Sequence, residues 1–501
     1  MKRVTPICTG LLAGLLFTFL APATPAASIV EVSQPDTAAR EMSVTLDRWG
    51  HATVVWTVNG SESTRPLQSR YESNGWQEWV NIESPGSNWN PRLAQADELT
   101  TAVWLSFHDG YYRVYGAGSF AGYWSQPQIL STPEPFWPAP TVAMDGQGCA
   151  IAAWSVEHGI SSRHFCQGGW GPETSLTGDD RSRSPQLTAN ASGSVIAVWE
   201  QAGGSHHAIA MARYESGRWS APEVLHQSSD IVARPQAVLD DRGNAVVAWE
   251  AAGANGTRLI QARQFHAGAW SPAVDLSSTL AMAAKPQLSM DRAGTVMAVW
   301  GIRVGDDLLV QSAYLAHGHW SPARTLGVAG HADNWGERGL PAPRIASMGA
   351  RQFTAIWASY ADRENTGAVN RASFQQGRWD SAEQLTTTSG FPEVDVAAQP
   401  DGQMIHVWNN SGVIQALSLG LNARLLSVKR SGAGRVTSNP GGIDCGEDCS
   451  ASLGHRQRVE LQAEPAPGAR FLGWSGACSG KKTTCRVRMM RNRIVKARFE
   501  R

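Results

Sequence analysis

The chain has 501 residues, and its 43 Lys and Arg balance 43 Asp and Glu, so the formal net charge at pH 7 is zero. After the first 27 residues no apolar run is long enough to cross a bilayer as a helix, so we expect no transmembrane segment. The zero net charge hides an asymmetry, because residues 424–501 carry sixteen Lys and Arg but six Asp and Glu.

The N-terminus has the order of features found in a secretion signal. Lys2 and Arg3 form a basic start, residues 11–20 are apolar but short for a membrane span, and small residues follow at Ala23 and Ala27. We expect a signal peptide over residues 1–27, cleaved near Ala27, with Ala23 as the alternative. The mature protein is then exported, and this signal serves both a periplasmic and a secreted fate.

Two series of tryptophans run along the chain in step. The first series recurs at a mean interval of about 50 residues, which is typical of a β-propeller built from four-stranded blades; its members are Trp56, Trp104, Trp154, Trp199, Trp249, Trp300, Trp357 and Trp408. The second follows the first by roughly 16–22 residues, mostly in Gly-x-Trp; it comprises Trp76, Trp124, Trp170, Trp219, Trp270, Trp320 and Trp379. The period predicts an all-β fold.

One repeat unit shows how each blade is built. It reads PQLSMDRAGTVMAVWGI over 286–302, LLVQSAYL over 308–315 and GHWSPARTL over 318–326. Small and large apolar residues share its strand segments, as expected where both faces of a blade are covered. Asp291 to Gly294 is a turn signal between two strands. Each unit therefore predicts four short antiparallel strands.

The number of units favours eight blades, with seven as the alternative. Such units fill residues 28–421, but the last one, over 391–419, lacks the Gly-x-Trp strand. Residues 28–34 (SIVEVSQ) can supply the missing strand, which would join the two ends of the ring and leave no open edge.

The recurring tryptophans have two interpretations. A large flat side chain that repeats between blades can fill every interface of the ring, because each buries ~150–250 Å². The second series could instead line sugar sites between blades, because Gly-x-Trp elements resemble those of some propeller lectins. We favour packing, because the element continues Trp-Ser-x-Pro-x-x-Leu as a structural strand would.

Seven cysteines less Cys8 of the predicted signal leave six, and an even number in an exported chain favours disulfides. Their grouping pairs Cys445 with Cys449, Cys478 with Cys485, and Cys149 with Cys166. Sequence does not prove this connectivity, and free buried thiols are the alternative for the last pair.

The repeat stops near Arg424, and residues 422–501 are expected to form a second, small β-rich domain. In order they contain Gly-x-Val-Thr-Ser-x-Pro at 434–440, Gly-Ile-Asp-Cys-Gly-x-x-Cys at 442–449 and Phe-x-Gly-Trp-Ser-Gly-x-Cys at 471–478. Thr-Cys at 484–485 and Val-x-Ala-x-Phe at 495–499 close the pattern. This segment resembles the bacterial repeat module related to the internalin B-repeats. The resemblance implies two short disulfide loops, Trp474 in the core and no enzymatic activity.

The last strands of this segment are more basic than the resemblance leads one to expect. The candidates for binding a polyanion such as an envelope polysaccharide are Lys481, Lys482, Arg486, Arg488, Arg491 and Arg493. Alternation along a hairpin would place most of the arginines on one side. The other interpretation is a solvated strand face that protects a sheet edge. We do not expect nucleic acid as the partner.

Aromatic and cationic residues recur in the connections that lead into the Pro-led first strand of each unit. Because connections of one type emerge on one face of a propeller, these side chains should gather at one rim, where aromatics stack on sugars and cations bind polar groups. The ligand-binding candidates are Trp89, Phe136, Trp137, Trp335, Phe391, Arg181, Arg183, Arg234 and Lys285. The alternative is that they fold back over the blade ends.

Signs of catalysis are weak. The units contain Ser-x-Asp-x-x-Gly, as at 289–294, which resembles the sialidase repeat, but Trp300 comes later than in that pattern. Glu200 and Glu250 follow the repeated tryptophan in two adjacent units, where paired carboxylates would have to lie ~5–10 Å apart to cleave a glycosidic bond. We assign no catalytic residue, metal ligand or cofactor, and we consider enzymatic activity the less favoured hypothesis.

The favoured hypothesis is a monomeric, exported, non-catalytic recognition protein. Its propeller would bind a glycan or another cell-envelope ligand on one face, and its basic C-terminal domain would attach to an anionic surface. A sialidase-like propeller glycosidase is the first alternative, and a protein–protein interaction scaffold is the second.

Overall fold

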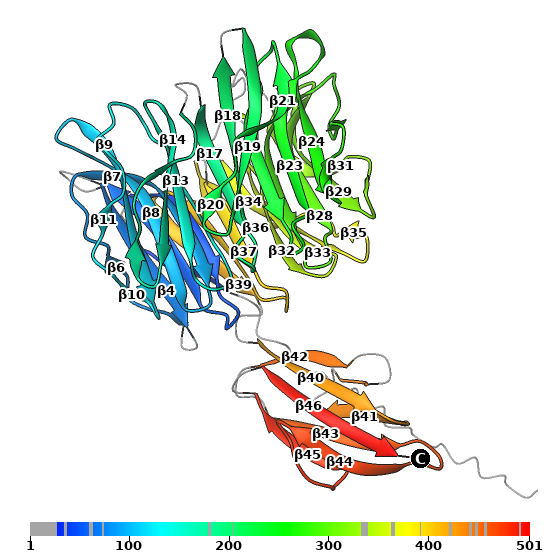
Figure 1. Cartoon of the computed structure of the whole chain (residues 1–501). Helices are drawn as coiled ribbons and strands as arrows, with labels where there is room; N and C mark the ends of the chain where they lie inside the picture. The colour runs from blue at the N-terminus through cyan, green and yellow to red at the C-terminus, as the bar shows by residue number, and fades with distance from the viewer. Residues whose placement is uncertain are drawn as a thin grey trace, which may run out of the picture.

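The computed structural model describes residues 28–34, 38–59, 64–72, 75–178, 182–203, 205–331, 339–361, 366–390, 392–419, 423–439, 443–445, 449–454, 458–489 and 492–500 (Figure 1). The predicted signal peptide over residues 1–27 lies outside these residues. Within them the chain is almost entirely β-strand, with one short 3-10 helix, η1 (Ala254–Gly256). None of the helices among the described residues is long and apolar enough to span a membrane.

Among the described residues, eight antiparallel sheets lie between residues 29 and 419. Blade 1 contains β2 (Ala39–Leu46), β3 (Ala52–Asn59), β4 (Thr64–Glu72), β5 (Gly75–Trp76) and β6 (Val80–Asn81). Blade 2 contains β7 (Ser87–Ala96), β8 (Leu99–His108), β9 (Tyr111–Phe120), β10 (Tyr123–Trp124) and β11 (Gln128–Ile129). Blade 3 contains β12 (Thr141–Met144), β13 (Ala150–Val156), β14 (Gly159–Cys166), β15 (Gly169–Trp170) and β16 (Thr174–Ser175).

The next three blades repeat this plan. Blade 4 contains β17 (Ser182–Ala189), β18 (Val195–Gly203), β19 (His206–Glu215), β20 (Arg218–Trp219) and β21 (Glu223–Ser228). Blade 5 contains β22 (Ala233–Leu239), β23 (Ala245–Ala252), β24 (Arg258–His266), β25 (Ala269–Trp270) and β26 (Val274–Asp275). Blade 6 contains β27 (Met282–Met290), β28 (Val296–Val304), β29 (Asp307–Ala316), β30 (His319–Trp320) and β31 (Arg324–His331).

The last two blades complete the ring. Blade 7 contains β32 (Arg344–Gly349), β33 (Gln352–Ala361), β34 (Thr366–Gln375), β35 (Arg378–Trp379) and β36 (Glu383–Ser389). Blade 8 contains β37 (Val394–Ala398), β38 (Met404–Asn410), β39 (Val413–Leu419) and β1 (Ile29–Glu31). The first strand of every blade contacts the first strand of the next, and β37 contacts β2, so these innermost strands form a closed ring.

The two ends of the propeller meet in blade 8. Strand β1 pairs antiparallel with β39, with Val30 opposite Ala416, and Val32 N donates to Ile414 O at 2.7 Å. This confirms both the eight-bladed ring and the expectation that residues 28–34 supply the missing strand. The seven-bladed alternative is wrong, because the described residues form eight blades.

The first tryptophan series forms the core of the blades. All eight of its side chains have no exposed surface. The second series packs between blades: Trp219 of blade 4 donates from Nε1 to Ser162 Oγ of blade 3 at 3.0 Å, and Trp170 of blade 3 packs with Val103 and Val114 of blade 2. The packing interpretation of the repeat is therefore supported.

A repeated turn ends the innermost strands. In blade 5 the Asp240 Oδ1 atom accepts hydrogen bonds from the backbone nitrogens of Arg242 and Asn244 at 2.9 and 2.8 Å. Asp291 makes the corresponding bonds in blade 6. Gly294 closes that turn with a φ of 81°, a conformation that glycine adopts without steric cost.

A second repeated feature lies at the start of the innermost strands, at the opposite end of the ring. One residue there adopts a left-handed backbone conformation, with φ between 44° and 59°, and in five of the blades the pairing register shifts beside it. These residues are Glu41, Asn90, Ala139, Ser184, Arg234 and Lys285. In all but the first, proline follows.

Two further sheets form the C-terminal part of the chain, below the ring in Figure 1. One has the order β42 (Ser450–Gly454), β40 (Ala423–Ser431), β46 (Arg493–Glu500) and β44 (Arg470–Gly476); the other has the order β41 (Gly434–Asn439), β43 (Arg458–Pro465) and β45 (Thr484–Arg488). Trp474 is buried in their shared core, as the resemblance implied. Residues 420–422 are outside the described residues, so the domain boundary there stays a prediction.

The structure contains the three disulfides that the grouping of cysteines favoured. Cys445 is joined to Cys449 and Cys478 to Cys485 in the C-terminal sheets, and Cys149 is joined to Cys166 across blade 3.

Candidate functional site

Two adjoining hollows lie where the innermost strands begin. The first, of about 630 Å³, is the mouth of the central channel and is lined by blades 2, 4, 5, 6 and 7. The second, of about 580 Å³, lies between blades 3 and 4. Ser184, one of the left-handed residues, lines both. The two hollows are therefore neighbours on the same end of the ring.

Beside the second hollow, aromatic rings from blade 2 and the loop after it form a cluster. The centroids of Trp89 and Trp137 are 5.7 Å apart, and Tyr112 lies 6.4 Å from the first and 5.8 Å from the second. Phe107 extends the group at 4.8 Å from Tyr112. Trp137 is 43% exposed, so the cluster presents an indole surface to solvent.

The backbone holds these rings in place. Trp89 belongs to β7 and lies opposite Leu105 of β8, directly before the left-handed Asn90. The loop that carries Trp137 is tied to β9, because Tyr112 and Glu134 exchange backbone hydrogen bonds at 2.9 and 2.8 Å. An aromatic surface on such a rigid support needs little ordering when it binds.

The lining of the mouth carries more cations than carboxylates, with Glu200 as its one acidic side chain among the described residues. Five cationic side chains line the mouth, from four different blades: Arg92, Arg234, Arg258, Lys285 and Arg344. Arg234 and Lys285 are left-handed residues, and Arg92 lies two positions after the left-handed Asn90. Gln186, Gln236 and Gln287 occupy the positions of Arg92 in blades 4, 5 and 6 and line the same mouth.

Two carboxylates support the mouth through the joints between blades. Glu200 of blade 4 accepts a hydrogen bond from the backbone nitrogen of Arg234 in blade 5 at 2.9 Å. Glu250 of blade 5 accepts one from the backbone nitrogen of Lys285 in blade 6 at 2.7 Å, and it also binds the Arg234 and Arg258 guanidinium groups. These glutamates therefore fix the left-handed residues of the following blade.

The cations in the mouth repel one another. Burial lowers the pKa of the Lys285 ammonium, and the nearby Arg234 and Arg344 lower it further, while Glu250 opposes them. Burial and then Arg344 lower the pKa of Arg92, against the opposing effect of Asp395. Arg92 lies deep in the ring but is open to the channel.

The predicted site residues fall into two groups. Trp89 and Trp137 are in contact, and Phe136, Trp137 and Arg183 line the second hollow, whereas Arg234 and Lys285 line the mouth. Three further predicted residues, Trp335, Phe391 and Arg181, lie outside the described residues.

Sequence reasoning did not find Arg92, Arg258, Arg344 or Tyr112. A signal for two of them exists in the repeat: Arg92 and Arg344 each follow the proline that begins an innermost strand, where other blades have glutamine. The repeat alignment could have identified this ring of equivalent positions.

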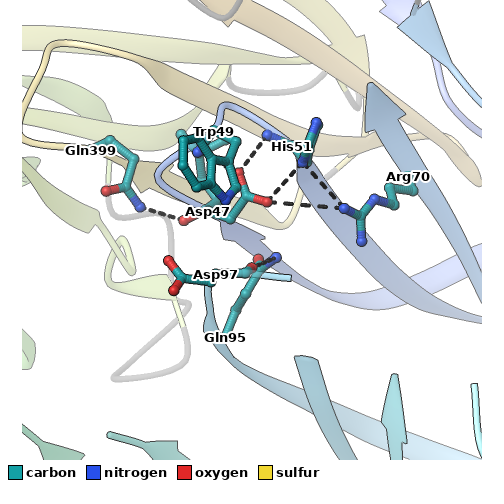
Figure 2. A network of polar contacts seen from close by, with 8 residues as sticks. Asp47, Trp49, His51, Arg70, Gln95, Asp97 and Gln399 are labelled. Carbon is teal, nitrogen blue, oxygen red and sulfur yellow. Dashed lines mark hydrogen bonds and ion pairs between the residues drawn. The ribbon is translucent and has the colours of Figure 1, made fainter. Parts of the chain in front are cut away.

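A separate polar network lies at the other end of the ring, in the turn after β2 (Figure 2). Asp47 Oδ1 accepts from the backbone nitrogens of Trp49 and His51 at 2.8 Å, as in the turns of the other blades. His51 Nδ1 lies 2.9 Å from Asp47 Oδ2 and 3.2 Å from Arg70 Nη2. Burial lowers the pKa of Arg424, and the nearby Asp401, Tyr71 and Asp47 oppose this shift. The chain therefore leaves the ring near this turn. We interpret the network as structural.

The basic residues of the C-terminal sheets do not share one face. Strand β45 pairs with β43, whereas β46 pairs with β40 and β44. The prediction that a hairpin aligns Arg486 and Arg488 with Arg493 is therefore wrong. Arg486 is paired with Glu460 at 2.6 Å, and Arg493 is half-buried. Lys481, Lys482 and Arg488 are exposed, and Arg491 lies outside the described residues.

One group of potential metal ligands occurs among the described residues. The ligand atoms of Cys149, His164 and Cys166 lie within 4.8 Å of one another. The two sulfurs are joined in a disulfide and so are not thiolates.

Comparison with known families supports the C-terminal resemblance. Residues 425–501 match the model of the divergent InlB B-repeat domain, and no curated protein matches the chain. Among solved structures, a PL25 ulvan lyase matches with a TM-score of 0.45 and 12% identity over 65% of this chain and 91% of that one. The polysaccharide lyase Uly1 matches with 0.45 and 8% over 78% and 99%.

A third similar structure is the GH93 α-L-arabinofuranosidase of Fusarium graminearum in complex with arabinobiose. Its TM-score is 0.37 and its identity 11%, over 56% of this chain and 92% of that one. TM-scores this low support no functional argument for this chain, so its function has to be inferred from its own site.

Proposed function

We propose that this protein is an exported, non-catalytic recognition protein whose propeller binds a glycan at the end of the ring where the innermost strands begin. The observation that carries the proposal is the contact between Trp89 and Trp137 beside an open hollow, with Trp137 43% exposed. Large exposed aromatic surfaces on soluble proteins mark binding sites more often than they mark packing.

The chemistry of the cluster suits a sugar. The C–H faces of a sugar ring are apolar and stack on indole, while its hydroxyl groups need hydrogen-bond partners around the edge. The hollow beside Trp137 is lined by the exposed Arg183 guanidinium group, with the buried hydroxyl groups of Ser155 and Ser182 behind it. This combination of an aromatic surface with convergent polar groups supports glycan binding.

In this proposal the C-terminal domain attaches the protein to an anionic surface of the cell envelope. Support comes from its excess of basic residues and from two pairs of like charges: Arg458 lies opposite Arg488 between β43 and β45, and Lys429 lies beside Lys496 between β40 and β46. Such pairs cost stability unless an anion offsets them. Weaker retention on an anionic resin after replacement of Lys429 and Lys496 by Gln would support this role.

The glycosidase alternative gains no support from Glu200 and Glu250. Both carboxylates accept backbone hydrogen bonds from the next blade, so their positions are explained by the joints of the ring. Release of sugar from a mixture of polysaccharides would revive that alternative.

A glycan array with two tryptophan variants tests the proposal. We expect the Trp89→Ala/Trp137→Ala protein to lose roughly tenfold or more of its affinity for the glycans that the wild type binds, equivalent to ~1.4 kcal/mol. Trp49→Ala is a matched control, because Trp49 is also 43% exposed but lies in a turn at the other end of the ring.

Each outcome is decisive. If the wild type binds no glycan on the array, the proposed function is wrong and the protein-scaffold alternative takes its place. If the double variant binds as well as the wild type while keeping its melting temperature, the site lies elsewhere, with the blade interfaces as the next candidate.

A further inference from the structure

We infer that the glycan is acidic, and that the cationic mouth of the channel is the subsite for a negatively charged sugar, carboxylated or sulfated. This inference rests on the proposed function, because it names the class of ligand for the same face of the ring.

The size and position of the mouth suit one sugar residue of a longer chain. Its volume of about 630 Å³ is within the usual range of ligand pockets, ~300–1,000 Å³. Because Ser184 lines both hollows, a chain that stacks on Trp137 can continue directly into the mouth. A single ligand can therefore meet the aromatic rings and the cations together.

The architecture does not require cations in the mouth. The left-handed position is occupied by Asn90 in blade 2 and Ser184 in blade 4, and asparagine adopts this conformation more readily than Arg or Lys. Arg234 and Lys285 thus occupy positions where a neutral residue would fold at lower cost. The backbone conformation therefore does not account for a cation at either position.

The same comparison applies to the position that follows the proline. Gln186, Gln236 and Gln287 fill it in three consecutive blades, and all three line the mouth without charge. Arg92 and Arg344 fill it in blades 2 and 7. The repeat therefore tolerates a neutral side chain at the positions of four of the five cations, Arg258 being the one not compared.

Carboxylates offset part of this charge. Glu200 belongs to the lining itself, and the nearby Asp395, Glu41 and Glu393 favour the charged form of Arg92. Glu250 is shared between Arg234 and Arg258, with contacts of 2.8 and 3.2 Å, so one carboxylate serves two guanidinium groups. Arg344 lies 3.8 Å from Asp395, a long ion pair. Lys285 Nζ donates to the carbonyl of Leu340 at 2.6 Å, which is a polar partner without a negative charge.

A carboxylate or sulfate would complete this arrangement. Anionic oxygens accept charge-assisted hydrogen bonds from guanidinium and ammonium groups, and these bonds are shorter and stronger than neutral ones. Burial contributes most to the lowered pKa of Lys285 and of Arg92, and repulsion from Arg234 and Arg344, respectively, adds to it. An anionic ligand would relieve that repulsion, whereas a neutral sugar would not.

Isothermal titration of the full chain with a galacturonate trimer and its methyl ester tests the inference, because the two probes differ in charge but share the sugar backbone. A sulfated galactose oligosaccharide without carboxylates separates sulfate from carboxylate binding. We expect the wild type to bind at least one acidic probe about tenfold or more tightly than the ester, with affinity that falls as salt rises.

Two variants localise the effect. Lys285→Asn restores the residue type best suited to the left-handed backbone and should weaken acidic binding about tenfold, while Lys285→Arg should retain it. Arg344→Gln copies blades 4 to 6 and gives a second, independent loss if the first variant folds poorly. Arg292→Gln removes an exposed arginine at the other end of the channel and should change nothing.

The outcomes separate the inference from the proposed function. If the ester binds as tightly as the acid, or Lys285→Asn and Arg344→Gln bind the acidic probe like the wild type, the acidic subsite is wrong while aromatic glycan binding can still stand. If acidic probes bind and depend on Lys285 but not on Trp89 and Trp137, the mouth is an acidic-sugar site and the aromatic cluster is not part of the glycan site.

Discussion

Glu250 accepts hydrogen bonds from Arg234 with both carboxylate oxygens, which lie 2.9 and 2.8 Å from the same guanidinium nitrogen. The Glu250 side chain is only 1% exposed. The same carboxylate accepts the backbone hydrogen bond of Lys285 in the next blade. Equivalent joints occur where Glu41 accepts from Asn90 N at 2.6 Å and Glu393 accepts from Glu41 N at 2.9 Å. Carboxylates thus link one blade to the next around the mouth of the channel.

Replacing Glu250 by Gln should lower stability and strengthen acidic binding at the same time. The variant leaves Arg234 and Arg258 without their shared counter-charge, and loss of one partner of a buried pair costs about 3 kcal/mol. Because Arg234 is half exposed, we expect about 2 kcal/mol less unfolding free energy in urea, together with severalfold tighter binding of the galacturonate trimer.

Glu200→Gln is the matched control for this experiment. Glu200 is half-buried and accepts one backbone hydrogen bond, which an amide oxygen can also accept, so we expect a loss below about 1 kcal/mol. Equal losses in the two variants would show that Glu250 has no special role in balancing the arginines.

The seam of the ring should be its most sensitive joint. Val32 is 7% exposed, belongs to the core shared by blades 1, 7 and 8, and donates its backbone hydrogen bond to Ile414. Val32→Asp buries an unpaired carboxylate, which should cost about 3 kcal/mol, release β1 and expose the edge of β39 to pairing with other chains.

Ile29→Asp provides the comparison, because Ile29 lies in β1, three residues before Val32, but is 38% exposed. Differential scanning calorimetry and size-exclusion chromatography should show a lower melting temperature and self-association for Val32→Asp, with little change for Ile29→Asp. A ring that stays monomeric and equally stable after Val32→Asp would mean that β1 does not close it.

The sequence was informative about the ring and less so about its mouth, for a physical reason. A buried tryptophan such as Trp300 repeats because one side chain fills the same space in each blade, so the period alone predicts the architecture. Alternation along a strand separates two faces, but it does not tell which one lines a channel. Arg92 and Arg344 were missed because only the closed ring brings blades 2 and 7 to one mouth.

In the C-terminal sheets, the sequence did not show which strands pair with each other, and this limited the prediction of a basic face. Local alternation correctly places Arg486 and Arg488 on one exposed face of β45. Strand β46, however, pairs in parallel with β40, with Leu426 opposite Arg493, and no local pattern reports so distant a partner. The disulfides were easier to predict, because each pair is close in sequence.

The disulfide in blade 3 should stabilise the propeller. It joins Cys149, just before β13, to Cys166 at the end of β14, with a sequence separation of 17 residues. A loop of this length corresponds to about 3 kcal/mol in the chain-entropy view. We expect Cys149→Ala/Cys166→Ala to unfold at lower urea concentration. Reducing agent should destabilise the wild type more than this variant, which keeps only the two disulfides of the C-terminal sheets. Loss of that difference would contradict a bond in the native protein.

His406 should make stability depend on pH in the acidic range. Its side chain has no exposed surface, lies 3.0 Å from Thr354 Oγ1 through Nε2, and has its pKa lowered to about 3 by burial and then by Arg371. The folded protein keeps His406 neutral, whereas the unfolded chain takes up a proton below its ordinary pKa of about 6.5. Stability due to this group is therefore complete above pH ~6.5 and falls as the pH drops towards 3, by up to about 1.4 kcal/mol per unit.

The His406→Gln variant isolates this contribution, because glutamine can still accept a hydrogen bond from Thr354 but does not titrate. We expect the urea-derived unfolding free energy of the wild type to fall more steeply between pH 7 and pH 4 than that of the variant, so that the two curves converge or cross. Other titrating groups are common to both proteins and cancel in the difference. Parallel curves over this range would mean that His406 is protonated as readily in the folded ring as in the unfolded chain.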